Sequence, residues 1–141
     1  MDLAFYPDEL ARLDIGIAPL ASTRFNRAKS WLKPLELAAC GVPVVMSDFA
    51  EYHRLHQTYG LGLVANTAAD WHEAIVHLAQ DRGLRLWMSV RSRQIVRDEL
   101  TIERHCFDWI EAWDHATWHR RVGWKSQGSM SGAARTRTLA G

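Results

Sequence analysis

The chain has few of the residues that cross-link small proteins or insert them into membranes. Cys40 and Cys106 are its two cysteines, and they are far apart and in no CxxC pattern. We therefore expect no disulfide framework, and we expect the protein to occupy a reducing compartment. No apolar run approaches the roughly 20 residues that cross a bilayer, and the N-terminus lacks the regions of a signal peptide. The net charge of +1 provides no strong field for nucleic acid or an anionic membrane. We expect a cytoplasmic protein with no nucleic-acid partner and no transmembrane segment.

Motifs for several common chemistries are also missing. The sequence contains no Ser-His-Asp order, no GxSxG motif and no GxxxxGK[ST] phosphate loop. His115 and His119 have the spacing of two metal ligands on one helix. A solvated helix face is the favoured interpretation for them, and a polar turn for His53 and His56. We predict no metal and no cofactor.

The composition is typical of a globular domain. The 141 residues fit one domain, and 48% of them are apolar and 23% charged. Five of the seven tryptophans occur from Trp87 onward, which favours amphipathic helices packed on a core over an aromatic ligand platform.

Apolar patterning in the first half predicts a βαβ unit, which implies a parallel sheet with a right-handed crossover. The helix of this unit would bury Leu32, Leu35 and Ala39. The predicted elements are a helix over 8–13, a strand over 14–20, a loop over 21–29, a helix with Ser30 as N-cap that ends at Gly41, and a strand over 42–48.

The second half predicts one more strand and three helices. Residues 62–65 form the strand, and Thr67 and Asp70 match a capping box that opens a helix. Buried stripes are expected at Trp71, Ala74, Ile75 and Leu78; at Leu84, Trp87, Met88 and Ile95 in a helix over 82–99; and at Ile102, Cys106, Trp109, Ile110 and Trp113 in a helix over 102–119. The remaining 123–141 segment has few large apolar residues, so we predict a disordered tail.

The residues that follow the first strand have the chemistry of an anion site. Lys29 and Lys33 flank a helix N-terminus, where two cations oppose the helix dipole unless a phosphate or diphosphate joins them. Both lysines could instead simply point into water. Glu36 lies in the first turns of the helix, where a carboxylate can accept both hydroxyls of a ribose or can be an exposed side chain.

The block of motifs in this region resembles the C-terminal domain of the glycosyl transferases group 1, which have the GT-B fold. The resemblance covers roughly residues 8–115. It implies an incomplete Rossmann-like sheet of about three strands, and binding of a nucleotide diphosphate-sugar by Asn26, Lys29, Ser30, Lys33 and Glu36. The matching motifs are Asp14-Ile-Gly-Ile-Ala-Pro-Leu20, Phe25-Asn26, Lys29-Ser30, Lys33, Leu35-Glu36, Ala38-Ala39, Gly41-Val-Pro-Val-Val45 and Ser47-Asp48.

The resemblance also has two departures. Many members carry a second glutamate eight positions before the ribose-binding one, and here that position is Ala28. The family's acceptor-binding N-terminal domain has no counterpart before Met1, so we expect residues 1–122 to be a partial donor-binding domain. In the complete enzyme the resemblance implies a retaining transfer without an obligatory metal. A separate N-terminal half would be the partner, and the chain alone would be inactive.

Three alternatives to a transferase half remain open. The chain could be a non-catalytic remnant or partner subunit that keeps the fold. A nucleotide-sugar epimerase of related architecture would need catalytic carboxylates and a histidine that the sequence does not identify. An assembly module would use an exposed sheet edge to pair with another chain.

Overall fold

The centre of the fold is a small parallel sheet. The computed structural model describes residues 3–128, and the chain divides into two units at the boundary between Thr101 and Ile102. In the first unit, β1 (Gly16–Ala18), β2 (Val44–Ser47) and β3 (Leu63–Ala65) pair in the order β1-β2-β3. Ile17 lies opposite Val45, and Val45 lies opposite Leu63. The predicted α/β architecture with a three-stranded, Rossmann-like parallel sheet is confirmed.

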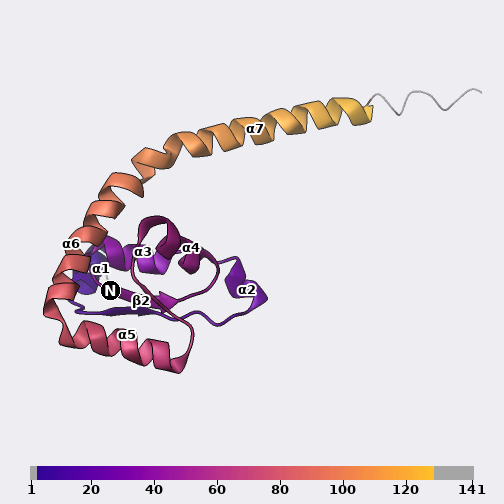
Figure 1. The fold of residues 1–141 in the computed structure, drawn as a ribbon. Helices are drawn as coiled ribbons and strands as arrows, with labels where there is room; N and C mark the ends of the chain where they lie inside the picture. The colour runs from indigo at the N-terminus through magenta and orange to yellow at the C-terminus, as the bar shows by residue number, and fades with distance from the viewer. Residues whose placement is uncertain (1–2, 129–141) are drawn as a thin grey trace, which may run out of the picture. The chain divides into compact units, whose positions relative to one another are not determined.

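Helices cover both faces of this sheet, as Figure 1 shows for α3 and α4 on one side and α5 on the other. Strand side chains alternate between two apolar clusters, because successive residues of a strand point to opposite faces. Val44 and Met46 pack with α3 and α4, whereas Val45 packs with α5. The helices of this unit are α1 (Tyr6–Ala11) after the 3-10 turn η1 (Leu3–Phe5), α2 (Arg24–Arg27), α3 (Leu32–Ala39), α4 (Ala50–Tyr59), α5 (Ala68–Gln80) and α6 (Arg82–Glu99).

Two helices follow the sequence signals closely. The capping box that opens α5 is present, with Thr67 accepting from the Asp70 amide and Asp70 accepting from the Thr67 amide. Leu78 is fully buried, and α6 has the bounds expected from its apolar pattern. Trp87 is a correction, because 60% of it is exposed while Met88 and Ile95 of the same helix are buried.

Helix α3 buries a different face from the one predicted. The expected stripe was Leu32, Leu35 and Ala39, but Leu32 and Ala39 are exposed and Leu35 is half-buried. The core residues are Pro34, Leu37 and Ala38, which also have helical spacing, so periodicity alone cannot choose between the two stripes. Ser30 is not the N-cap. That position is taken by Trp31, whose side chain makes no capping hydrogen bond.

Two segments expected to be irregular are helical. The segment over 21–29 contains the short α2, which begins because the Thr23 hydroxyl accepts a hydrogen bond from the Asn26 amide at 3.1 Å. His53 and His56 lie in α4 and not in a polar turn. The Nδ1 atom of His56 lies 3.2 Å from the Leu61 carbonyl oxygen, which ties α4 to the turn that precedes β3.

The second unit contains the long helix α7 (Ile102–Gly128). It runs past the predicted end near His119 and so includes the first residues of the expected tail. Arginine, lysine and glutamine favour helix there, and a single interior glycine costs only about 1 kcal/mol. Residues 129–141 of the predicted tail lie outside the described residues. The apolar side chains of α7 that were expected to be buried are largely exposed, among them Ile102, Trp109 and Trp113.

The two cysteines and the apolar character of the helices were also points of the sequence analysis. Cys40 and Cys106 are free thiols and half-buried. Within residues 3–128, no helix is both long enough and apolar enough to cross a membrane.

Candidate functional site

Three of the five predicted site residues line one cavity. Lys29, Lys33 and Glu36 border a space of about 510 Å³ that lies against β1 and is closed on another side by Tyr6 of α1. We call it the Lys33 cavity. Two of these side chains are basic, and Gly16, Ile17 and Ala18 of β1 also line the cavity. The cavity therefore combines positive charge with an apolar wall.

Glu36 is held in place by two donors. The Tyr6 hydroxyl donates to Glu36 Oε2 at 3.0 Å, and Lys33 Nζ donates to the same oxygen at 3.3 Å. Lys33 Nζ also donates to the Tyr6 hydroxyl oxygen at 3.1 Å, so the three groups form a closed triangle. The Glu36 side chain is 28% exposed. The carboxylate is thus oriented and half-buried, and both contacts use one of its two oxygens.

The hydrogen bond to Tyr6, followed by that to Glu36, raises the pKa of Lys33 above its ordinary value of 10.5. A raised lysine pKa keeps the ammonium charged throughout the neutral range. Lys33 is therefore a permanent cation at the wall of the cavity.

Asn26 and Ser30 have other positions. The Asn26 side-chain amide donates to the Ala21 carbonyl oxygen at 2.9 Å, which fixes the loop between β1 and α2. Ser30 is exposed between α2 and α3. Neither residue lines the Lys33 cavity.

A second cavity, of about 520 Å³, lies where the three parallel strands end. We call it the strand-end pocket. Ser47 closes β2, and its hydroxyl accepts a hydrogen bond from the Leu20 amide at 2.7 Å, which ties the end of β1 to the end of β2. Open α/β sheets bind ligands at this edge. The lining includes Ser22, Ser47, Asp48, Phe49, Asn66 and Trp71.

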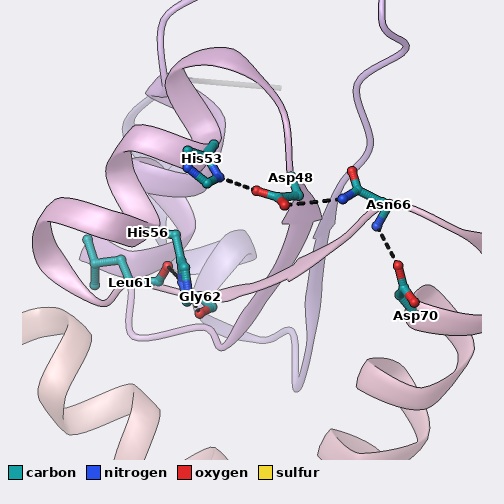
Figure 2. Close-up of polar contacts among 7 residues, drawn as sticks. All are labelled: Asp48, His53, His56, Leu61, Gly62, Asn66 and Asp70. Atoms are coloured by element: carbon teal, nitrogen blue, oxygen red, sulfur yellow. Dashed lines mark hydrogen bonds and ion pairs between the residues drawn. The ribbon is translucent and has the colours of Figure 1, made fainter.

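Asp48 is the centre of a polar network at this pocket (Figure 2). One of its oxygens pairs with His53 Nδ1, and the other accepts from the Asn66 side-chain amide at 3.1 Å. Asp70 Oδ2 accepts from the backbone amides of Asn66 and Thr67 at 3.0 and 2.9 Å. The Thr67 amide, then the Asn66 amide, lowers the pKa of the Asp70 carboxyl below 3.8.

Sequence reasoning did not identify this network as a site. The sequence patterns place Asp48 at the end of a predicted strand and in a family motif, and they assign no role to Asn66. The available signal was position, because Asp48 and Asn66 each directly follow a strand of the same parallel sheet. Side chains in that position meet at one edge.

Known proteins provide no assignment for either cavity. Comparison with family models, with curated proteins and with solved structures found no match to this chain. Among residues 3–128, no three histidine, cysteine or acidic side chains lie close enough together to hold a metal ion.

Proposed function

We propose that this chain is the donor-binding half of a glycosyltransferase of the group 1, GT-B type, and that the Lys33 cavity binds a nucleotide diphosphate-sugar. The observation that carries the proposal is that Lys29, Lys33 and Glu36 border one cavity. Two cations and one carboxylate are the groups that a diphosphate and a ribose require.

The chemistry of the cavity fits the two ends of such a ligand. Lys29 and Lys33 would hold the diphosphate, and their charge would stabilise the leaving group when the glycosyl bond breaks, which is the largest catalytic contribution expected of this half. Glu36 would accept hydrogen bonds from the ribose hydroxyls. Charge-assisted hydrogen bonds of this kind contribute about 1.5–3 kcal/mol each.

The test is a calorimetric titration of the purified chain with UDP, GDP and ADP. We expect one of them to bind with a Kd below the millimolar range, and Glu36→Gln to weaken that binding about tenfold or more through loss of the charged acceptor. Glu9→Gln is the matched control, because Glu9 is an exposed carboxylate of α1 that pairs with Arg12. Absence of binding by all three nucleotides would overturn the proposal, and so would equal binding by the Glu36 and Glu9 variants.

A second candidate function is assembly with another chain. Ile17 of β1 is 58% exposed, and within residues 3–128 β1 pairs with β2 alone, so its other edge is open to a further strand. A stable dimer in sedimentation experiments, together with no nucleotide binding, would favour this function over donor binding.

A further inference from the structure

We propose that α7 is an interaction surface for a second copy of this chain, and that it docks on the outer face of α6 of that copy. The two helix faces carry exposed apolar side chains and opposite charge. Neither face contains a residue that lines the Lys33 cavity, so the proposal is independent of donor binding.

Helix α7 has an apolar stripe along one side. Residues at positions i, i+4, i+7, i+11 and i+14 lie on one side of a helix, because an α-helix has 3.6 residues per turn. In α7 these positions, which we call the α7 stripe, are Ile102, Cys106, Trp109, Trp113 and Ala116. Trp109 and Trp113 are 63% and 65% exposed, and their rings meet edge to face with centroids 6.4 Å apart. Exposed apolar surface of this extent marks a contact with another molecule.

The outer face of α6 offers a surface of matching kind. The buried residues of α6 are Met88, Ser92 and Ile95. Helical spacing places another row on the opposite side, which we call the α6 row, made of Leu86, Val90, Arg93 and Arg97. Leu86 and Val90 are 56% and 67% exposed. The α6 row therefore combines apolar surface with guanidinium groups, which pack well against the faces of aromatic rings.

Charge decides which of these helices pair. Helix α6 contains five arginines and two carboxylates. Over residues 102–117, the part of α7 whose side chains the structure describes, there are four carboxylates and one arginine, and Glu103 and Asp114 border the α7 stripe. Two α7 helices side by side would bring carboxylates together, and two α6 helices would bring arginines together. Opposite charges meet only when α7 of one copy lies against α6 of the other, so charge favours this pairing over both like pairings.

The pairing closes at two copies. Each copy carries one α7 stripe and one α6 row, so a two-fold axis makes the same contact twice and uses both surfaces of both copies. Tryptophan and arginine are the residue types that most often dominate the binding energy of an interface. The α7 stripe supplies the first type and the α6 row supplies the second. We therefore expect a dimer.

Sedimentation velocity of the full chain over a range of concentrations tests the proposal. We expect a dimer whose dissociation constant rises about tenfold or more in Trp113→Glu and in Val90→Glu, because each variant places a charge in the apolar contact. Phe107→Glu is the matched control. Phe107 is 74% exposed on the same helix but lies off the α7 stripe, so this variant should dimerise as the parent chain does. Circular dichroism and thermal melts check that all three variants remain helical and folded.

Charge reversal identifies the two helices that pair. One variant carries Glu103→Lys with Asp114→Lys, and the other carries Arg93→Glu with Arg97→Glu. Each variant has α6 and α7 of like charge, so we expect each alone to be monomeric and an equimolar mixture of the two to recover the dimer. Higher salt should weaken the parent dimer, because salt screens the attraction between the two helices.

Chemical cross-linking locates the contact. Cys106 lies in the α7 stripe, and Cys40→Ser removes the other thiol of the chain. In this background, Val90→Cys should give cross-linked dimers between positions 90 and 106 with a short bismaleimide. Glu73→Cys is the control, because Glu73 is exposed on α5, and it should give no such product.

Four outcomes would overturn the proposal. The first is a chain that stays monomeric at every concentration, including one in which α7 folds back on its own α6. The second is equal weakening of the dimer by Trp113→Glu and Phe107→Glu. The third is a dominant cross-link between two Cys106 residues, which would indicate paired α7 helices. The fourth is a monomer that binds neutral lipid vesicles through α7. Nucleotide binding is a separate measurement, so absence of UDP binding leaves the expected dimer unchanged, and a monomer leaves donor binding unchanged.

Discussion

The Tyr6 hydroxyl donates its hydrogen bond to Glu36, the carboxylate assigned to the ribose, across 30 positions of sequence. The same hydroxyl accepts from Lys33, so α1 and α3 are joined at the wall of the Lys33 cavity. A ribose hydroxyl that approaches Glu36 would compete with Tyr6 for the carboxylate.

Replacement of Tyr6 by phenylalanine should therefore change affinity and stability in opposite directions. Tyr6→Phe leaves Glu36 free of one donor, so we expect UDP, GDP or ADP to bind a few-fold more tightly in calorimetry. Loss of the half-buried hydrogen bond should lower the free energy of unfolding by about 0.5–1.5 kcal/mol in urea. Tyr59→Phe is the control, since Tyr59 does not line this cavity. Weaker nucleotide binding by Tyr6→Phe would mean that the hydroxyl assists the ligand.

Lys33 should make stability depend on pH in the alkaline range. The pKa of Lys33 in the folded chain is raised above 10.5, chiefly by Tyr6 and to a smaller extent by Glu36. The contribution of Lys33 to folding stability is therefore fully present below pH 10.5. The contribution is lost as the pH rises through the higher folded pKa. An NMR titration of the lysine side chains should show the shift, and Tyr6→Phe should reduce it. An unchanged Lys33 titration in that variant would show that Tyr6 is not the main cause.

Asp70 should make folding stability depend on pH in the acid range. Its pKa is lowered from 3.8, chiefly by the Thr67 backbone amide, so its contribution to stability is present above 3.8 and is lost as the pH falls through the folded value. We expect Asp70→Asn to lower stability at neutral pH and to flatten the acid limb of the stability curve. Urea unfolding followed from neutral pH into the acid range measures both effects. A parallel acid limb in the two proteins would contradict the assignment.

The turn before β3 offers a matched pair of glycine substitutions. Gly60 and Gly62 both have positive φ angles, of 65° and 69°, so alanine is strained at either position. A Cβ at Gly62 would also lie 2.8 Å from Val44 Cγ1, whereas at Gly60 the nearest atom is 3.9 Å away. We expect Gly60→Ala to cost about 1–2 kcal/mol, and Gly62→Ala to cost more because packing must shift as well. Denaturant unfolding measures the loss in the free energy of unfolding for each variant. Equal losses for the two variants would mean that the contact with Val44 relaxes freely.

Local sequence signals predicted the elements that depend on neighbouring residues. The Thr67 and Asp70 capping box and the bounds of α6 belong to this class. Local signals did not predict the features that tertiary contacts determine, such as which face of a helix is buried. The sheet selects the Leu37 side of α3 over the Leu32 side, and both sides have the same helical spacing. The sequence did not predict helix α4, because its first residue, Ala50, has a positive φ angle that no local signal indicates. Its two histidines instead suggested a polar turn.

The candidate site was predictable to the same extent. Lys33 and Glu36 are three positions apart on one helix, so their shared wall follows from helical geometry. Tyr6 could not be predicted, because its contact with Glu36 depends on how α1 packs against α3. The pairing of Asp48 with Asn66 likewise requires the order of the strands, which no local pattern contains.

The position of β1 at one end of the sheet has a consequence for local opening. Pairing β1 with β2 closes a longer loop of chain than pairing β2 with β3, and β1 has a neighbour on one side only in the described chain. Edge elements of this kind exchange their amide hydrogens through small openings well below the global unfolding energy. Because Gly16, Ile17 and Ala18 line the Lys33 cavity, a ligand that contacts β1 there would slow hydrogen exchange in this strand first.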